Sequence, residues 1–69
     1  MHKDLRTVEG IVRAQLPSGL YEVEVDARRV TAHIGSGLER NFVRLLVGDR
    51  VVVELTARDL GRGRIVRKA

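Results

Sequence analysis

Cysteine is absent from this chain of 69 residues, and Tyr21 and Phe42 are its only tyrosine, phenylalanine or tryptophan residues. Without cysteine the chain has no disulfide framework and no thiolate metal site. Two aromatic rings are few for a protein that stacks single-stranded bases, and we expect both in the core. No apolar run approaches the roughly 20 residues of a membrane span, and no charged-then-apolar leader opens the chain. We therefore expect a soluble, cytoplasmic protein with no membrane partner.

Residues suited to catalysis or metal binding are also scarce. Of the two histidines, His2 lies at the polar start and His33 has no carboxylate placed to orient it for a nearby Ser36. No group of His, Cys and Asp has metal-ligand spacing. Glu22 and Glu24 share one face of a predicted strand, which is typical of a solvated surface. We predict that the chain is not an enzyme and holds no cofactor or metal.

Positive charge is present, and it is unevenly distributed. The net charge is +4 and the isoelectric point is near 10.7. Residues 1–55 hold eight basic and eight acidic side chains, whereas residues 56–69 hold five basic and one acidic. A basic segment of this kind favours a polyanionic partner. The alternative is a solvated tail that is charged for solubility. Eleven of the thirteen basic residues are arginine, whose guanidinium can bind phosphate through two hydrogen bonds.

Apolar and polar residues alternate in short segments, which predicts an all-β chain. The predicted strands cover 6–16, 20–26, 30–34, 51–55 and 64–67, with turns at 17–19, 26–28 and 47–50 and a loop over 56–63. Gly10 indicates a bulge or sharp bend in the first strand. In the second, Tyr21, Val23 and Val25 share one face. In the fourth, Val51, Val53 and Leu55 are expected inside, with Val52 and Glu54 outside.

One short helical turn is predicted over 36–44, between the third and fourth strands. Ser36 and Glu39 have capping-box spacing, and Arg40 and Arg44 lie four apart on one side of the turn. Strand count alone leaves SH3-like barrels open. The inserted turn favours a five-stranded Greek-key OB-fold barrel, which binds nucleic acid on its second and third strands and adjacent loops. We expect residues 1–69 to form one monomeric domain, frayed at 1–5 and 67–69.

The sequence also resembles bacterial-type translation initiation factor 1 from Val8 to Lys68. The matching blocks are Val30-Thr-Ala-His-Ile34, Arg40-Asn-Phe-Val-Arg44, Gly48-Asp-Arg-Val51, Val53-Glu-Leu-Thr56 and Asp59-Leu60-x-x-Gly63-Arg-Ile-Val66. The resemblance implies an OB-fold that occupies the decoding (A) site of the small ribosomal subunit during initiation. It implies contacts with 16S ribosomal RNA and a neighbouring ribosomal protein. It also implies a block to premature tRNA entry and support for the second and third initiation factors.

Carried over to this sequence, the resemblance implies a set of RNA-binding residues: His33, Arg40, Arg44, Arg62, Arg64, Arg67 and Lys68. For His33, exposure on the third strand fits ligand contact and a plain structural role equally. Gly37 and Glu39 depart from the family pattern, which often has basic residues there, and the connection after Asp26 is one residue shorter. A diverged paralogue therefore stays open. So do two other functions, a general single-stranded RNA chaperone on an OB-fold and a protein-interaction module with a basic end.

Overall fold

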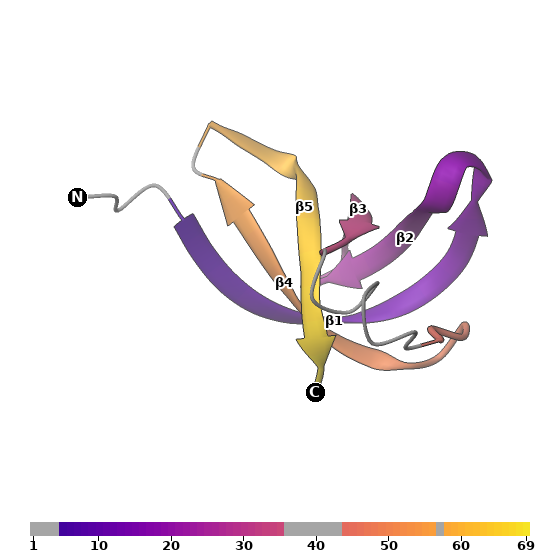
Figure 1. Cartoon of the computed structure of the whole chain (residues 1–69). Coiled ribbons are helices and arrows are strands. Elements are labelled where there is room, and N and C mark those ends of the chain that lie inside the picture. The colour runs from indigo at the N-terminus through magenta and orange to yellow at the C-terminus, as the bar shows by residue number, and fades with distance from the viewer. Residues whose placement is uncertain (1–4, 36–43, 57) are drawn as a thin grey trace.

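A computed structural model describes residues 5–35, 44–56 and 58–69, which form a closed five-stranded β-barrel (Figure 1). The strands are β1 Leu5–Leu16, β2 Leu20–Val25, β3 Arg28–Ile34, β4 Arg50–Thr56 and β5 Asp59–Lys68, with a single-turn 3₁₀ helix, η1, at Pro17–Gly19. Around the barrel the order is β1-β2-β3-β5-β4. Closure pairs both edges of each strand, so the described strands leave no open edge for aggregation. The predicted all-β OB-type barrel is confirmed.

Strand β1 closes the barrel because it pairs with two neighbours in succession. Leu5–Ile11 pair antiparallel with β4, and Ile11–Leu16 pair antiparallel with β2. At the changeover a Cβ on Gly10 would lie 2.6 Å from Val23 Cγ1 and 2.7 Å from the Glu24 carbonyl oxygen. Glycine thus allows a close approach where the strand changes partners, whereas the sequence predicted a bulge or sharp bend at this position. The irregularity in the ladder itself lies further along β1, between Val12 and Ala14.

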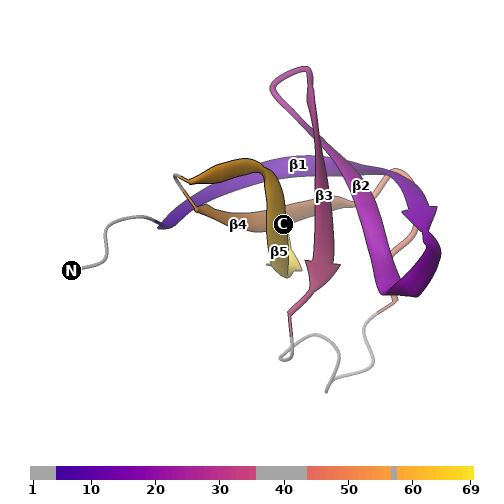
Figure 2. The same ribbon diagram turned by 90° about the horizontal axis from the view of Figure 1, so that it is seen from above.

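The observed extent of β5 differs from two predictions made from the sequence. The segment 56–63 was predicted to be a loop, but β5 begins at Asp59 and pairs parallel with β3 and antiparallel with β4. Figure 2 shows β5 and β3 side by side. Residues 67–69 were predicted to fray, yet Lys68 pairs with Val51 and the Ala69 amide donates to the Arg50 carbonyl at 2.9 Å. Pairing with two strands compensates for the glycines that made this segment resemble a loop.

The connection between β2 and β3 is the tight turn that the sequence predicted. Asp26 and Ala27 both have positive φ, 51° and 66°, which is the conformation of a two-residue type I′ hairpin. Strand β2 consequently ends at Val25 and β3 begins at Arg28 rather than Val30. The hairpin places the two strands in direct register, with Leu20 opposite His33.

The core is aliphatic and fills the barrel interior. Its buried members are Val12, Val23, Val25, Val30, Ala32, Leu45, Val51, Val53, Leu55 and Ile65. Tyr21 is half-buried against this cluster, as expected for a core aromatic. Val52 was predicted to point outward into solvent, but only 3% of its surface is exposed. It lies outside the core cluster, and its register partners Glu9 and Arg67 flank it on the outer face of the sheet.

The helical turn predicted over 36–44 falls almost wholly outside the described residues. The flanks of this segment are well fixed, because the Gly35 amide donates to the Ile65 carbonyl at 2.8 Å. On the other flank, buried Leu45 accepts a hydrogen bond from Gln15 Nε2 at 3.1 Å. Phe42, predicted to be in the core, is also outside the described part. Within that part, no helix is long and apolar enough to cross a bilayer.

Candidate nucleic-acid interface

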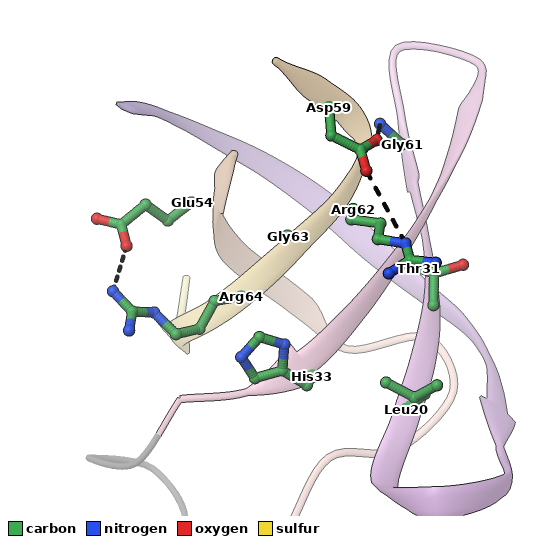
Figure 3. Close-up of a pocket in the computed structure, with 9 residues that line it drawn as sticks. All are labelled: Leu20, Thr31, His33, Glu54, Asp59, Gly61, Arg62, Gly63 and Arg64. Carbon is green, nitrogen blue, oxygen red and sulfur yellow. Dashed lines mark hydrogen bonds and ion pairs between the residues drawn. The ribbon is translucent and has the colours of Figure 1, made fainter. Parts of the chain in front are cut away.

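A shallow groove of about 630 Å³ runs along the outer face of the barrel where β3 and β5 meet (Figure 3). Residues from β2, β3, β4 and β5 line it: Leu20, Thr31, His33, Glu54, Asp59, Gly61, Arg62, Gly63 and Arg64. The groove includes Leu20 of β2 and Thr31 and His33 of β3. It therefore lies on the face of the second and third strands, which OB-folds use for binding nucleic acid.

Strand register determines which side chains meet in the groove. The parallel ladder sets Thr31 opposite Arg62 and His33 opposite Arg64. Since side chains alternate along a strand, both arginines point outward while the intervening Gly63 faces the interior. A Cβ on Gly63 would lie 2.6 Å from side-chain atoms of Leu55 and Val53. The glycine that resembled a loop signal therefore lets β5 lie close to β4 and present its arginines.

Each groove arginine has a carboxylate partner. Arg64 Nη2 lies 2.5 Å from Glu54 Oε1, across the β4–β5 ladder in which the two residues are directly opposite. Arg62 Nε lies 3.9 Å from Asp59 Oδ2, and the other carboxylate oxygen of Asp59 accepts from the Gly61 amide at 3.1 Å. With His33 neutral, the formal charge of the described residues that line the groove is zero. The charges of Arg62 and Arg64 are thus locally balanced.

The remaining predicted site residues lie outside the groove lining. Arg67 and Lys68 are exposed further along β5, opposite Val52 and Val51. Lys68 Nζ lies 3.4 Å from Asp49 Oδ2, whereas Arg67 makes no ion pair within the described part of the chain. Arg44 is exposed just before the buried Leu45, and Arg40 belongs to the residues that the structure does not describe. Among the described members of the predicted set, the structure therefore brings together His33, Arg62 and Arg64 in the groove.

Among the described residues, Asp49 is the one whose side-chain pKa differs clearly from its ordinary value. Its Oδ2 accepts a hydrogen bond from the Leu46 amide at 2.9 Å, which lowers the pKa of the carboxyl below its usual 3.8. The positive charge of Lys68 lowers the pKa further, against an opposing effect of desolvation. Lys68 is consequently tied to the turn before β4, a structural engagement that its basic character alone did not indicate.

Sequence reasoning missed six residues that line the groove: Leu20, Thr31, Glu54, Asp59, Gly61 and Gly63. Two of them carried a signal. Thr31 shares the outward face of its strand with His33, and Glu54 was predicted to point outward. Which strand lies beside which is a nonlocal property, so their convergence required the barrel topology.

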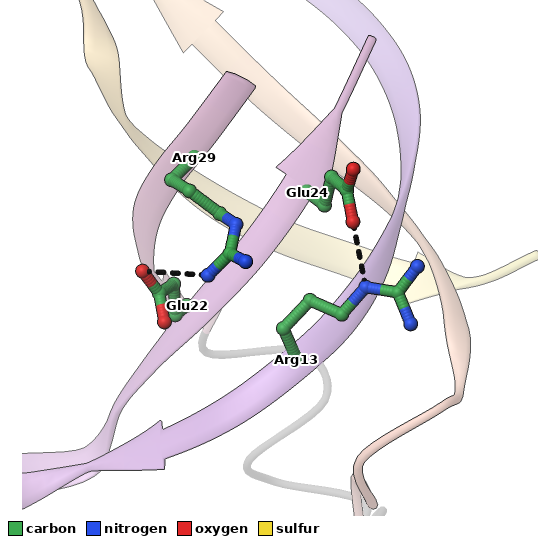
Figure 4. Close-up of polar contacts among 4 residues, drawn as sticks. All are labelled: Arg13, Glu22, Glu24 and Arg29. Atoms are coloured by element: carbon green, nitrogen blue, oxygen red, sulfur yellow. Dashed lines mark hydrogen bonds and ion pairs between the residues drawn. The ribbon is translucent and has the colours of Figure 1, made fainter. Parts of the chain in front are cut away.

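On the outer face formed by β1, β2 and β3, two glutamates each form an ion pair with an arginine (Figure 4). Arg13 Nε pairs with Glu24 Oε1 at 2.7 Å, and Arg29 Nη1 pairs with Glu22 Oε2 at 3.0 Å. These glutamates are the two that the sequence placed on one strand face. Their partners are arginines, so the arrangement is charge-balanced and unsuited to acid–base chemistry. No group of three or more His, Cys, Asp or Glu among the described residues could hold a metal ion.

Comparison with known proteins gives two informative structural matches. The solution structure of translation initiation factor 1 from the Wolbachia endosymbiont strain TRS of Brugia malayi superimposes with a TM-score of 0.78. The two sequences are 36% identical, over 97% of this chain and 80% of that one. The crystal structure of YjeQ from Thermotoga maritima gives a TM-score of 0.73 at 24% identity, over 93% of this chain but 23% of the other, and supports the fold alone. No protein-family model matches the chain.

Proposed function

The chain belongs to the translation initiation factor 1 family, and from this premise we propose that it binds the small ribosomal subunit at the decoding (A) site during initiation. The observation that carries the proposal is the coincidence of family membership with an arginine-containing groove on the nucleic-acid face of an OB-fold. Its partners would be 16S ribosomal RNA, a neighbouring ribosomal protein, and the second and third initiation factors.

The mechanism we infer is occupancy without chemistry. Arg62 and Arg64 offer planar guanidinium groups to phosphate oxygens. The exposed His33 on β3, opposite Arg64, adds a hydrogen-bonding ring. A folded RNA is recognised mainly through its shape and its phosphates. The bound barrel blocks premature entry of tRNA and biases the subunit toward initiation. The protein acts as a cytoplasmic monomer, with no catalytic step of its own.

The aromatic content argues against the alternative of a general single-stranded RNA chaperone. Such proteins stack bases on exposed rings. Within the described residues, the single Tyr, Phe or Trp side chain is Tyr21, and it packs against the core. Among the described residues that line the groove, the imidazole of His33 is the one ring. The described surface therefore fits recognition of phosphates and shape better than sequence-tolerant stacking.

Chemical footprinting of purified small subunits, with and without the protein, tests the proposal. We expect protection confined to decoding-site nucleotides and retained in the presence of excess heparin. Protection scattered over the subunit, or abolished in proportion to added heparin, would favour a basic module that binds any polyanion. Protection of single-stranded regions alone would favour the chaperone.

A further inference from the structure

The connection between β3 and β4 returns to the barrel at the buried Leu45, directly after the exposed Arg44. Two hydrogen bonds hold this connection against the barrel. The Gly35 amide donates to the Ile65 carbonyl at 2.8 Å, and Gln15 Nε2 donates to the Leu45 carbonyl at 3.1 Å. The first bond joins two backbones, whereas the second depends on the side chain of one residue in β1. A single substitution can therefore release the backbone next to Arg44.

An irregularity in β1 determines which way Gln15 points. The ladder with β2 shifts by one residue between Val12 and Ala14. Such a shift moves every following side chain to the opposite face of the strand. Regular alternation from the buried Val12 would have turned Gln15 to the outer face of the barrel. Instead Gln15 lies opposite Tyr21, which packs against the core, and residues directly opposite in a ladder share a face. The irregularity thus turns Gln15 toward the core and Leu45.

Several anchors at Leu45 together determine the direction in which the chain leads back to Arg44. The carbonyl of the peptide unit after Leu45 accepts from Gln15, and the amide of the same unit donates to Asp49 Oδ2 at 2.9 Å. The Leu45 side chain is only 1% exposed, within the core. Bond angles at an α-carbon vary little, so a fixed side chain and a fixed following peptide also fix the direction of the preceding bond. Loss of the Gln15 amide removes one of these anchors.

We propose that Gln15 is a positioning residue for RNA binding, which orients Arg44 toward ribosomal RNA by fixing the Leu45 backbone. This inference rests on the proposed function, because it assumes that Arg44 contacts RNA in the bound complex. Unlike Arg62 and Arg64, Arg44 has no ion-pair partner within the described part of the chain. An arginine without such a partner takes its position from its backbone, which the hydrogen bond of Gln15 helps to hold.

Holding this backbone in advance lowers the cost of binding. A flexible group that becomes ordered when two molecules associate opposes the association, by about two- to tenfold in affinity for one long side chain. An arginine on a mobile backbone loses the freedom of that backbone in addition to the freedom of its own side chain. Gln15 removes the backbone part of this cost before RNA arrives. Its contribution therefore appears in the affinity, although Gln15 itself does not touch RNA.

The test replaces Gln15 with methionine, which is unbranched and uncharged, as glutamine is, but cannot donate a hydrogen bond. In the free protein, ¹⁵N relaxation should give a lower order parameter for the Arg44 backbone amide in Gln15→Met than in the parent, where we expect the value of about 0.85 that is typical of rigid backbone. In filter binding to purified small subunits, Gln15→Met should weaken the affinity about two- to tenfold, because the backbone at Arg44 must then become ordered on binding.

Two further variants separate positioning from the stability of the barrel. In an Arg44→Gln background, Gln15→Met should leave subunit affinity unchanged, because the residue through which it acts is missing. Ser18→Ala is the control for loss of an uncharged polar side chain nearby in the sequence, since Ser18 is exposed in η1 and lies outside the groove lining. It should change neither the order parameter of Arg44 nor the affinity. Thermal unfolding of each variant verifies that the barrel is intact.

Each contrary result has its own meaning. An unchanged order parameter for Arg44 in Gln15→Met, or a lower one without loss of affinity, would overturn the inference. Equal losses of affinity from Gln15→Met with and without Arg44 would assign the effect to direct contact or to barrel stability, and would overturn it as well. If the unaltered protein did not bind small subunits, the proposed function would fail by itself, while the order parameter would still decide whether Gln15 fixes the backbone at Arg44.

Discussion

Two glycines mark the places where the barrel has no room for a side chain. Gly10 lies where β1 passes from β4 to β2, and Gly63 lies where β5 faces β4. At both, a Cβ would come within 2.6 Å of core side-chain atoms. At Gly10 it would also meet a backbone atom, the Glu24 carbonyl oxygen at 2.7 Å, which cannot rotate away. Small residues at these points are a requirement of closing so narrow a barrel.

We expect Gly10→Ala to lower the free energy of unfolding by about 1–3 kcal/mol, the usual cost of overpacking. Urea denaturation measures the loss. Gly61→Ala is the matched control, because the nearest atom to its Cβ would be Asp59 Oδ1 at an ordinary 3.5 Å. That variant should stay within about 0.5 kcal/mol of the parent. Equal stability of Gly10→Ala and the parent would show that the strands can separate at the bend without cost.

At the scale of elements, the turn before β4 connects three parts of the barrel. Two hydrogen bonds between Leu46 and Asp49 close the turn. The Asp49 amide donates to the Leu46 carbonyl, and the Leu46 amide donates to Asp49 Oδ2. The Gly48 amide donates to the Val12 carbonyl on β1 at 2.7 Å. Lys68 at the end of β5 completes the set through its ion pair with Asp49. The turn thereby helps to hold the C-terminal end of β5 in place.

The lowered pKa of Asp49 makes this stabilisation depend on pH. A carboxyl whose pKa falls on folding contributes stability above its unfolded pKa, near 3.8, and loses it as the pH drops through the lower folded value. Asp49→Asn removes the charge, so it should be less stable than the parent at neutral pH. The difference should shrink below about pH 4 and vanish in stronger acid. Urea unfolding across pH measures both proteins; a gap that persists in acid would mean that the charge is not its source.

At the scale of the whole molecule, the structure spreads the C-terminal charge over two regions of β5. Arg62 and Arg64 face carboxylates in the groove, while Arg67 has no ion-pair partner in the described part of the chain. The net charge of +4 therefore does not measure the strength of any single site.

Replacing the four β5 cations Arg62, Arg64, Arg67 and Lys68 with glutamine should weaken subunit binding and flatten its salt dependence. The slope should fall by up to about 0.7 for each phosphate that the variant no longer neutralises, the value for single-stranded RNA. A control that removes the same charge from exposed positions elsewhere substitutes Arg6, Arg13, Arg28 and Arg29. Filter binding over a salt series measures both. Identical slopes for the parent and the β5 variant would exclude β5 from the interface.

Part of this structure follows from local sequence pattern. Alternation is a property of neighbouring residues, so it correctly placed Tyr21, Val23 and Val25 on the inner face of β2. The same reasoning predicted a tight turn after β2 and an outward His33. The motif series predicted the family that the comparison supports. That residues 1–69 are a single domain, and that the seven selected residues contact RNA, stay predictions.

Tertiary structure decided the remainder, because it depends on which strands become neighbours. Parallel pairing with β3 turned the apparent loop at 59–63 into strand, and flanking by β1 and β5 buried Val52. The pairing of Glu54 with Arg64 spans ten positions in sequence and exists because β4 and β5 meet in that register. The sequence by itself determined the barrel and its basic end. Closure of the barrel placed a carboxylate beside each of the groove arginines Arg62 and Arg64. Which charged side chains meet across two strands depends on the register of those strands, and composition does not determine it.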